Sequence, residues 1–391
     1  MAPIRSGIRH TTGKTLLQAR IALETGLTFT GRLFGAPRDA AGELVFHTGM
    51  TGYQEILSDP SYAGQIVLFT APHIGNYGIH TEDYESGRVH PVGVIVRDHC
   101  RRSYHRRAER SLDDLLRRDG VPGLSDVDTR ALTIAVRDGG TCRAAIGSGS
   151  VEELVERAKA VPRMEDVDWV ARVTTRAPYD VPADAHPDHP GEAPFRVAVM
   201  DFGVKRSILQ RLAAEGIAAH VLPAHTTAAE LSRGDYEGVF LSNGPGDPAS
   251  QPGLVNTVQL LLAADLPIFG ICLGHQLLAR ALGAETVKLP FGHHGANHPV
   301  QTLADGRVSI TSQNHNYAVP ADSLPAGRAR VTQLSLNDGT VEGMELPGRP
   351  VYSVQYHPEA APGPRDSRHV FARFRREMDA RRRRGLAKGA P

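Results

Sequence analysis

The sequence predicts two α/β domains in one chain. The second is built on a doubly wound, mostly parallel open sheet, and the first is smaller and of mixed α/β type. The chain has 391 residues, more than one ordinary hydrophobic core holds. Short apolar segments alternate with helical patterns after residue 195, as in parallel sheets covered on both faces. A stretch rich in proline, residues 176–194, separates that pattern from the strands and turns before it.

The first domain is expected to span residues 21–175 and to begin with a β-hairpin. Alternating apolar residues between positions 22 and 34 flank the turn sequence Glu24-Thr-Gly26. Asp128 directly precedes a helical pattern, so we interpret it as the N-cap of that helix rather than as a metal ligand paired with Asp126. The other expected elements are strands at 44–46 and 66–69 and helices at 129–136 and 151–160.

The two ends of the chain are expected to lie outside these domains. Residues 1–20 carry basic and no acidic side chains, which we interpret as a flexible extension in preference to a transit peptide. Residues 382–391 continue a run of arginines, and we expect a solvated basic tail, with contact to RNA or a membrane as the weaker alternative. The second domain then spans residues 195–381, after the linker at 176–194.

The second domain shows repeated strand and helix signals. Because the carboxyl ends of parallel strands share one edge of the sheet, ligands bind beyond that edge. Two of these ends carry unusual residues: Cys272, and the segment 242–248, which contains two glycines and two prolines. The expected strands are 196–200, 217–222, 238–241, 268–271 and 351–355, and the expected helices are 205–215, 254–263 and 276–283.

Composition excludes several classes of partner. There are 44 Lys and Arg residues against 43 Asp and Glu, so the net charge of +1 creates no field that would attract nucleic acid. No segment approaches the roughly 20 apolar residues that span a membrane. The three cysteines show neither metal-binding spacing nor a disulfide framework. We therefore expect a cytoplasmic protein that binds neither nucleic acid nor a membrane.

Cys272 is the first candidate for chemistry. The apolar strand 268–271 ends at Gly270-Ile-Cys272-Leu-Gly274 and passes directly into a helical pattern. Small glycines on both sides allow the sharp turn that exposes a nucleophile at the top of a sheet, and a helix N-terminus favours a thiolate. Taken alone, a cysteine in an apolar stretch is more often a small buried hydrophobe.

Other strand ends supply partners for such a thiol. His357 and Glu359 follow the strand 351–355 and stand two residues apart, so in extended chain they share one side. The carboxylate can then hold one ring nitrogen while the other faces the thiol. Gly244 allows the backbone to approach a ligand closely, and the amides of Gly244 and Leu273 are candidate oxyanion donors. Together these residues favour nucleophilic catalysis.

These motifs resemble a known family. Gly-Ile-Cys272-Leu-Gly-His-Gln with a downstream His357-Pro-Glu is similar to the class I glutamine amidotransferases. Four segments of the first domain narrow the resemblance to the small subunits of carbamoyl phosphate synthase, and the likeness runs from about Leu23 to Phe374. These segments are Thr48-Gly-Met-Thr-Gly-Tyr-Gln-Glu55, Asp59-Pro-Ser-Tyr62, Pro72-His-Ile-Gly-Asn76 and Asp128-Thr-Arg-Ala-Leu132.

The resemblance implies an activity and a set of roles. Cys272 would attack the side-chain amide of L-glutamine, His357 would protonate the leaving ammonia and activate water, and Glu359 would fix the imidazole. Ammonia would pass to a separate large subunit that makes carbamoyl phosphate for arginine and pyrimidine synthesis from bicarbonate and ATP with Mg²⁺, so no cofactor is expected in this chain. The implied glutamine-binding residues are Ser61, Gly244, Gly246, Leu273, Gln276, Asn314, Asn316 and Tyr317.

The chain departs from the family pattern at three positions. The family usually has Gly-Phe where this chain has Asn316-Tyr317, and Asn where His47 stands. If the backbone of residue 316 contacts glutamine, Asn can serve there because it tolerates left-handed backbone. If Gly is needed for space, affinity for glutamine is expected to fall.

Three alternatives stay open at this stage. His293, His294 and His298 are candidates for a metal site, but no acid or cysteine lies near them along the chain, so we expect no metal. A regulatory subunit without turnover would keep the same scaffold, although the complete Cys272, His357 and Glu359 set argues against it. A free-standing γ-glutamyl hydrolase would have no evident need of the first domain.

Overall fold

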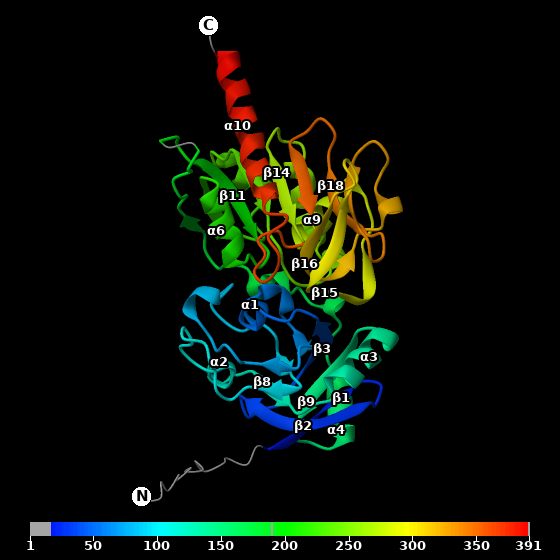
Figure 1. Ribbon diagram of the computed structural model, residues 1–391. Coiled ribbons are helices and arrows are strands. Elements are labelled where there is room, and N and C mark those ends of the chain that lie inside the picture. Colours follow the sequence, from blue (N-terminus) through cyan, green and yellow to red (C-terminus); the bar gives the residue numbers. More distant parts are fainter. Residues whose placement is uncertain (1–16, 189–190, 390–391) are drawn as a thin grey trace, which may run out of the picture.

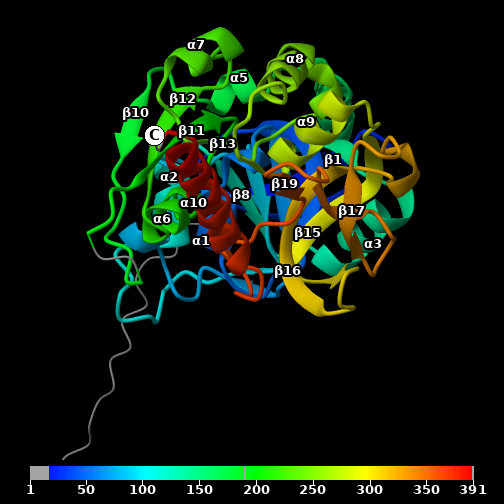
Figure 2. The same cartoon turned by 90° about the horizontal axis from the view of Figure 1, so that it is seen from above.

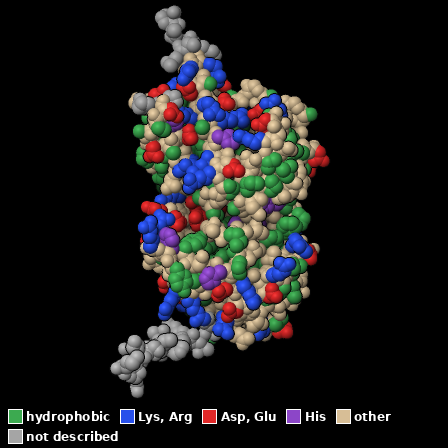
Figure 3. Space-filling view, in the orientation of Figure 1, with side chains coloured by type: hydrophobic (Ala, Val, Ile, Leu, Met, Phe, Trp, Pro, Cys, Tyr) green, Lys and Arg blue, Asp and Glu red, His purple; other side chains and the backbone are tan. Residues whose placement is uncertain are grey.

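The computed structural model describes residues 17–188 and 191–389, which form two lobes stacked end to end (Figure 1). The first lobe runs from β1 to α5, and the second runs from β10 to α10. None of the helices in these two ranges is both long and apolar enough to cross a bilayer. Side chains of both charge signs are interspersed over both lobes on the face of Figure 3.

A closed barrel forms the centre of the first lobe, with strand order β1-β2-β8-β6-β4-β3-β9. It begins with the expected hairpin, because β1 pairs antiparallel with β2. The strands are β1 (Gln18–Leu23), β2 (Thr28–Gly35), β3 (Ala40–His47), β4 (Gln65–Phe69), β6 (Gly93–Ile95), β8 (Pro122–Ser125) and β9 (Cys142–Gly147), with β5 (His73–Ile74) and β7 (Asp98–His99) paired separately.

Helices cover this barrel and carry its connections. Asp128 caps α3 as predicted, because its carboxylate accepts a hydrogen bond from the amide of Ala131 at 3.0 Å. Alternate residues of β3 and β4 enter two different cores, one shared with α1 and α2 and the other with α3. The helices are α1 (Tyr53–Ser58), α2 (Leu112–Arg118), α3 (Thr129–Gly139), α4 (Val151–Lys159) and α5 (Val170–Val173).

The second lobe contains a ten-stranded open sheet of order β10-β12-β11-β13-β14-β19-β18-β17-β15-β16. The predicted doubly wound part is its centre, where β12, β11, β13, β14 and β19 run parallel. An antiparallel extension through β18, β17, β15 and β16 completes it. The strands are β10 (Tyr179–Val181), β11 (Phe195–Asp201), β12 (Ile217–Pro223), β13 (Gly238–Leu241), β14 (Ile268–Ile271), β15 (Val287–Thr302), β16 (Val308–Ala318), β17 (Arg330–Ser335), β18 (Val341–Glu345) and β19 (Val351–Val354).

Helices cover both faces of the parallel strands, as Figure 2 shows from above. One core joins α7, α8 and α9 to one face of the sheet, and a second joins α6 and α10 to the other. Because both faces are buried, the strands read as continuous apolar runs in the sequence. The helices are α6 (Arg206–Ala214), α7 (Ala228–Arg233), α8 (Pro252–Leu261), α9 (Leu273–Leu282) and α10 (His369–Gly389).

The structure corrects three of the expected boundaries. Strand β1 begins at Gln18, inside the expected extension, because its apolar residues pair with β2 and β9; residues 1–16 lie outside the described ranges. The expected linker contains β10, which pairs with β12 at the sheet edge, where nearby prolines are tolerated. Helix α10 continues to Gly389 and so takes in most of the expected tail, because arginine, alanine and leucine are good helix formers.

Candidate active site

Cys272 lies at a strained turn between β14 and α9. Its backbone has φ 53° and ψ −105°, which a residue with a side chain rarely adopts. A Cβ atom on Gly274 would lie 2.2 Å from the carbonyl oxygen of Leu241, so only glycine fits there. Cys272 is 2% exposed, and its Sγ lies 3.6 Å from the carbonyl oxygen of Asn314. The turn therefore has the geometry of a nucleophile elbow.

His357 and Glu359 follow β19, the parallel neighbour of β14. Nδ1 of His357 lies 2.7 Å from Oε1 of Glu359, while Nε2 is buried without a hydrogen-bond partner. Burial by itself lowers the pKa of His357, but Glu359 and the Cys272 sulfur raise it to about 10. The structure therefore brings the three residues together, with the imidazole positioned to stay protonated beside the thiol.

Lys205 is a member of this site that the sequence reasoning missed. It follows the carboxyl end of β11, and its Nζ donates to Oε1 of Glu359 at 2.7 Å and to the carbonyl oxygen of Ala361 at 2.6 Å. Burial raises the pKa of Glu359, but Lys205 and His357 lower it to about 2. One signal could have revealed this lysine, namely its place after a parallel strand, the same edge at which Cys272 and His357 lie.

A small pocket opens beside Cys272 and is lined by seven of the eight predicted glutamine-binding residues. The eighth, Leu273, is the first residue of α9, so its amide has no partner within the helix and remains available to an oxyanion. The lining residues are Ser61, Gln65, Met164, Gly244, Pro245, Gly246, Cys272, Gln276, His294, Asn314, His315, Asn316 and Tyr317.

The first lobe contributes Ser61 to this pocket. The Ser61 hydroxyl accepts a hydrogen bond from Nδ2 of Asn243 in the second lobe at 3.0 Å. Asp59 holds the same segment, because Oδ1 accepts from the Ser61 amide and Oδ2 accepts from Nδ2 of Asn314, both at 2.9 Å. The pocket therefore lies at the contact between the lobes.

The glycines after β13 allow two stretches of backbone to meet at the pocket. A Cβ atom on Gly244 would lie 2.3 Å from the carbonyl oxygen of Phe202 and 2.9 Å from Cδ2 of Leu273. Gly246 has φ +93°, which also favours glycine. The backbone of Gly244 thus lies directly against the Leu273 side chain.

Asn316 and Tyr317 turn out to be held by neighbouring side chains. Residue 316 lies in β16 without a positive φ, so the expected need for left-handed backbone does not arise. Its Oδ1 lies 2.8 Å from Nε2 of His294, and its Nδ2 donates to Oε1 of Glu43 at 2.9 Å. The Tyr317 carbonyl accepts from Nε2 of Gln276 at 2.7 Å.

The class of protein follows from this geometry and one comparison. A thiol at an elbow and a carboxylate-held histidine, with the backbone of Gly244 close to Leu273, are the parts of a cysteine acyl-transfer site. The family model described as glutamine amidotransferase class-I matches residues 198–376, which include all of these groups. The second lobe is a class-I glutamine amidotransferase domain.

The particular family follows from the whole chain. The model described as carbamoyl-phosphate synthase small chain, CPSase domain, matches residues 21–146. The chain is 47% identical to the carbamoyl phosphate synthase small chain of Syntrophotalea carbinolica, over 94% of this chain and 99% of that one. It is 51% identical to the carbamoyl phosphate synthase small chain of Symbiobacterium thermophilum, over 90% of this chain and 96% of that one. The chain belongs to the carbamoyl phosphate synthase small chain family, which confirms the predicted enzyme class and does not favour the regulatory or free-standing hydrolase alternatives.

Proposed function

We propose that this chain hydrolyses L-glutamine through a γ-glutamyl thioester on Cys272 and supplies the ammonia to a large subunit. One observation carries the proposal: the elbow cysteine and the Glu359-held His357 lie at neighbouring strand ends beside a pocket at the lobe contact. The orientation of the imidazole matters most, because its free Nε2 is the atom that must exchange protons with the thiol and the leaving group.

The first half-reaction forms the thioester. The Cys272 sulfur, with its proton on His357, attacks the side-chain amide carbon, and the carbonyl electrons move to oxygen. The amides of Leu273 and Gly244 stabilise that oxyanion. When the oxyanion collapses, the carbon–nitrogen bond breaks, and Nε2 of His357 gives its proton to the departing nitrogen, which leaves as ammonia.

The second half-reaction releases glutamate. Nε2 of His357, now neutral, takes a proton from water, and the resulting hydroxide attacks the thioester carbon. The carbon–sulfur bond breaks and returns the sulfur to Cys272 as a thiolate beside a protonated His357. Throughout both steps Glu359 contacts only Nδ1 of the ring, so it positions the imidazole and stabilises its charge.

The remaining residues of the pocket would hold the amino acid. Ser61, Gly246, Gln276 and Asn314 line the space next to the sulfur and offer hydroxyl, amide and carboxamide groups to the charged end of glutamine. We further propose that ATP, bicarbonate and Mg²⁺ are bound by the large subunit. The expected cytoplasmic location is supported by Cys100, Cys142 and Cys272, which are all unpaired thiols.

The test separates the hydrolysis of glutamine from the synthesis of carbamoyl phosphate. In a complex of the full chain with its large subunit, Cys272→Ser should abolish carbamoyl phosphate synthesis from glutamine and leave synthesis from added ammonia intact. Mass spectrometry of the quenched wild-type complex should show a glutamyl adduct on Cys272. Unchanged use of glutamine by the variant would overturn the proposal, and full glutaminase activity without any partner would instead indicate a free-standing hydrolase.

A further inference from the structure

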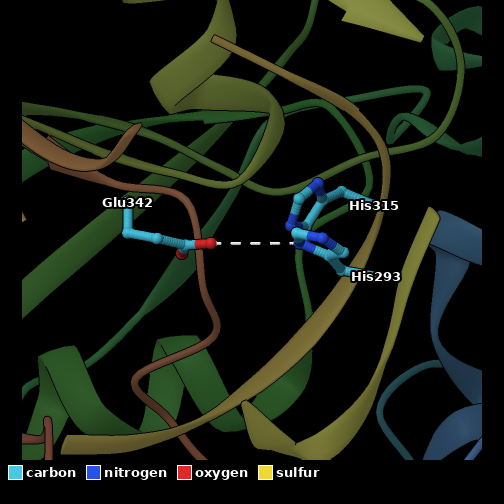
Figure 4. A group of neighbouring side chains, drawn as sticks. All are labelled: His293, His315 and Glu342. Atoms are coloured by element: carbon cyan, nitrogen blue, oxygen red, sulfur yellow. Dashed lines mark ion pairs between the residues drawn. The ribbon is translucent and has the colours of Figure 1, made fainter. Parts of the chain in front are cut away.

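Three buried side chains next to the glutamine pocket form a cluster that the proposed reaction does not use. They are His293 on β15, His315 on β16 and Glu342 on β18, and Figure 4 shows the carboxylate directed at His293 with His315 beside it. They are 7%, 5% and 0% exposed. One ligand atom of each lies within 4.8 Å of the other two. We propose that this cluster binds one divalent transition-metal ion, of which Zn²⁺ is the representative.

Two unpartnered atoms define the position of the ion. Nδ1 of His293 and Oε1 of Glu342 are both buried, both lack a hydrogen-bond partner, and lie 4.0 Å apart. That separation is too long for a hydrogen bond, even from a protonated carboxyl group. In a tetrahedral site with Zn–N and Zn–O bonds of about 2.0–2.2 Å, two such atoms lie about 3.4 Å apart, so a small side-chain movement would bring both into the shell of one ion. A cation between the two atoms would satisfy both.

The second polar atom of each of the three side chains contacts a neighbouring protein group. Nε2 of His293 lies 2.9 Å from Oδ2 of Asp338, and Oε2 of Glu342 accepts from Nε2 of Gln313 at 2.9 Å. Nδ1 of His315 lies 2.8 Å from the carbonyl oxygen of Tyr317. These contacts fix the ring orientations and leave one lone pair on each histidine for a metal, as outer contacts do in metal sites.

The contact between His315 and Gln313 also favours a bound cation. With its proton on Nδ1, the ring presents a lone pair at Nε2, which lies 3.0 Å from Oε1 of Gln313, another acceptor. Turning the amide round would instead place its oxygen against the Glu342 carboxylate. A cation at this point removes the repulsion between the two acceptors.

The ligand set defines the class of ion. Two imidazoles and one carboxylate suit zinc and its neighbours cobalt and nickel, whereas magnesium and calcium prefer sites made of oxygen alone. Water or Gln313 can complete a four-coordinate shell. No acid or cysteine lies near His293 along the chain, but the fold brings Asp338 and Glu342 to it from the region of β18.

The position of the cluster indicates its role. β16 carries His315 between Asn314 and Asn316 of the glutamine pocket, and the backbone of Ser312 accepts from the amide of His357 at 2.9 Å. An ion joining β15, β16 and β18 would stiffen the wall of the pocket behind the substrate. This role is structural, and its test does not depend on glutamine hydrolysis.

The experiment measures metal binding by the full chain carrying Cys272→Ser, so that the active-site thiol cannot capture the ion. After chelator treatment and dialysis, calorimetric titration with zinc chloride should show one equivalent bound. Co²⁺ in its place should give the visible bands of a tetrahedral site of nitrogen and oxygen ligands. In the same background, Glu342→Gln should weaken zinc binding by at least tenfold, and Asp338→Asn should weaken it by about 10- to 100-fold.

A matched control and a stability measurement complete the test. Glu345 lies on the same strand as Glu342 but contacts Arg330 and Arg373. The control variant Glu345→Gln should therefore leave zinc binding unchanged. Zinc should raise the melting temperature of the parent chain and not that of Glu342→Gln, whose fold is checked by circular dichroism. Zinc affinities that are equal in the parent and Glu342→Gln, or no stoichiometric binding in either, would overturn the proposal.

Discussion

Nζ of Lys205 and Nδ1 of His357 both contact the same atom, Oε1 of Glu359, each at a distance of 2.7 Å. The carboxylate therefore lies between two cations in a fully buried position, and its ionised form depends on both. Lys205 also lies 3.9 Å from Glu85 of the first lobe. The lysine thus links the proposed catalytic histidine to the contact between the lobes.

Replacing this lysine should make stability depend differently on pH. Lys205→Met removes a charge that keeps the pKa of Glu359 near 2, below its unfolded value of 4.5. A depressed pKa contributes stability above pH 4.5, which is lost as the pH falls towards 2. The variant should therefore be less stable at pH 7 by about 3–5 kcal/mol, and the difference should shrink below pH 4.5.

Urea unfolding of both proteins at pH 7 and pH 4 measures this difference. Lys159→Met is the matched control, since the Lys159 side chain is half exposed and its ion pair within residues 17–188 and 191–389 is with Glu156 in α4. Its free energy of unfolding should change by less than about 1 kcal/mol. A Lys205→Met variant as stable as the parent at pH 7 would show that Glu359 does not need this cation.

Glu359→Gln tests the positioning role of the carboxylate. The amide keeps the shape of the side chain but removes a charge that raises the pKa of His357. The imidazole then loses its proton at lower pH, and the thiolate loses its counter-charge. We expect kcat for glutamine hydrolysis to fall by about two orders of magnitude or more, with a small change in KM.

Steady-state kinetics across the pH range provide the measurement. The basic limb of the kcat/KM profile should move to lower pH in Glu359→Gln, a shift that a purely structural role would not produce. Glu156→Gln, an exposed substitution in α4, should leave the profile unchanged. A parent-like profile in Glu359→Gln would contradict the assigned role.

The sequence predicted those parts of the site that depend on local geometry. Gly270 and Gly274 indicate the elbow because the turn itself requires them, and His357 and Glu359 are two residues apart in the chain. Lys205 escaped prediction because its partners are Glu85, in the other lobe, and Glu359, which is 154 residues further along the chain. Contacts between distant segments leave no periodic signal in a single sequence.

For the fold too, features set by nearby residues were predicted, and features set by contacts between distant segments were not. Alternating strands and helices predicted the parallel centre of the second lobe, and the spacing of Asp128 predicted the start of α3. The antiparallel partners of β15 were not predicted, because strand pairing depends on residues far apart in the chain. Likewise, the contacts that anchor Arg382 of α10 on the body of the lobe join residues far apart in the chain and were not predicted.

Asn316, where the family usually has glycine, should contribute more to stability than to substrate affinity. Its carboxamide contacts His294 and Glu43, and Lys288 holds the other oxygen of Glu43 at 2.6 Å. Asn316→Gly leaves a buried carboxylate oxygen without its partner, so we expect a loss of about 1–3 kcal/mol in the free energy of unfolding. KM for glutamine should change by less than about threefold.

A double-mutant cycle with Glu43→Gln isolates the contact between the lobes. The losses of the two single variants should not add in the double variant, because both remove the same interaction. Urea unfolding and glutamine kinetics are measured on all four proteins. Additive losses, or a tenfold rise in KM with unchanged stability in Asn316→Gly, would show that the carboxamide serves the substrate instead.

The end of α10 offers a comparison between adjacent arginines. Arg382 donates to both carboxylate oxygens of Glu237, and its guanidinium lies 3.9 Å from the ring centroid of Phe195. The Arg383 side chain is 72% exposed and, among the described residues, its ion pair is with Asp379, one turn earlier in the helix. A forked ion pair stacked on an aromatic ring is stronger than an exposed pair between side chains four residues apart.

Arg382→Ala should therefore lower the free energy of unfolding by about 1–2 kcal/mol, whereas Arg383→Ala should change it by less than about 0.5 kcal/mol. Urea unfolding at low and high salt provides the measurement. The loss in Arg382→Ala should persist at high salt, since packing of the guanidinium on Phe195 is screened less than an exposed charge pair. Equal effects of the two substitutions would mean that the last turns of α10 are not anchored through Arg382, and that helix propensity alone extends the helix past the expected domain end.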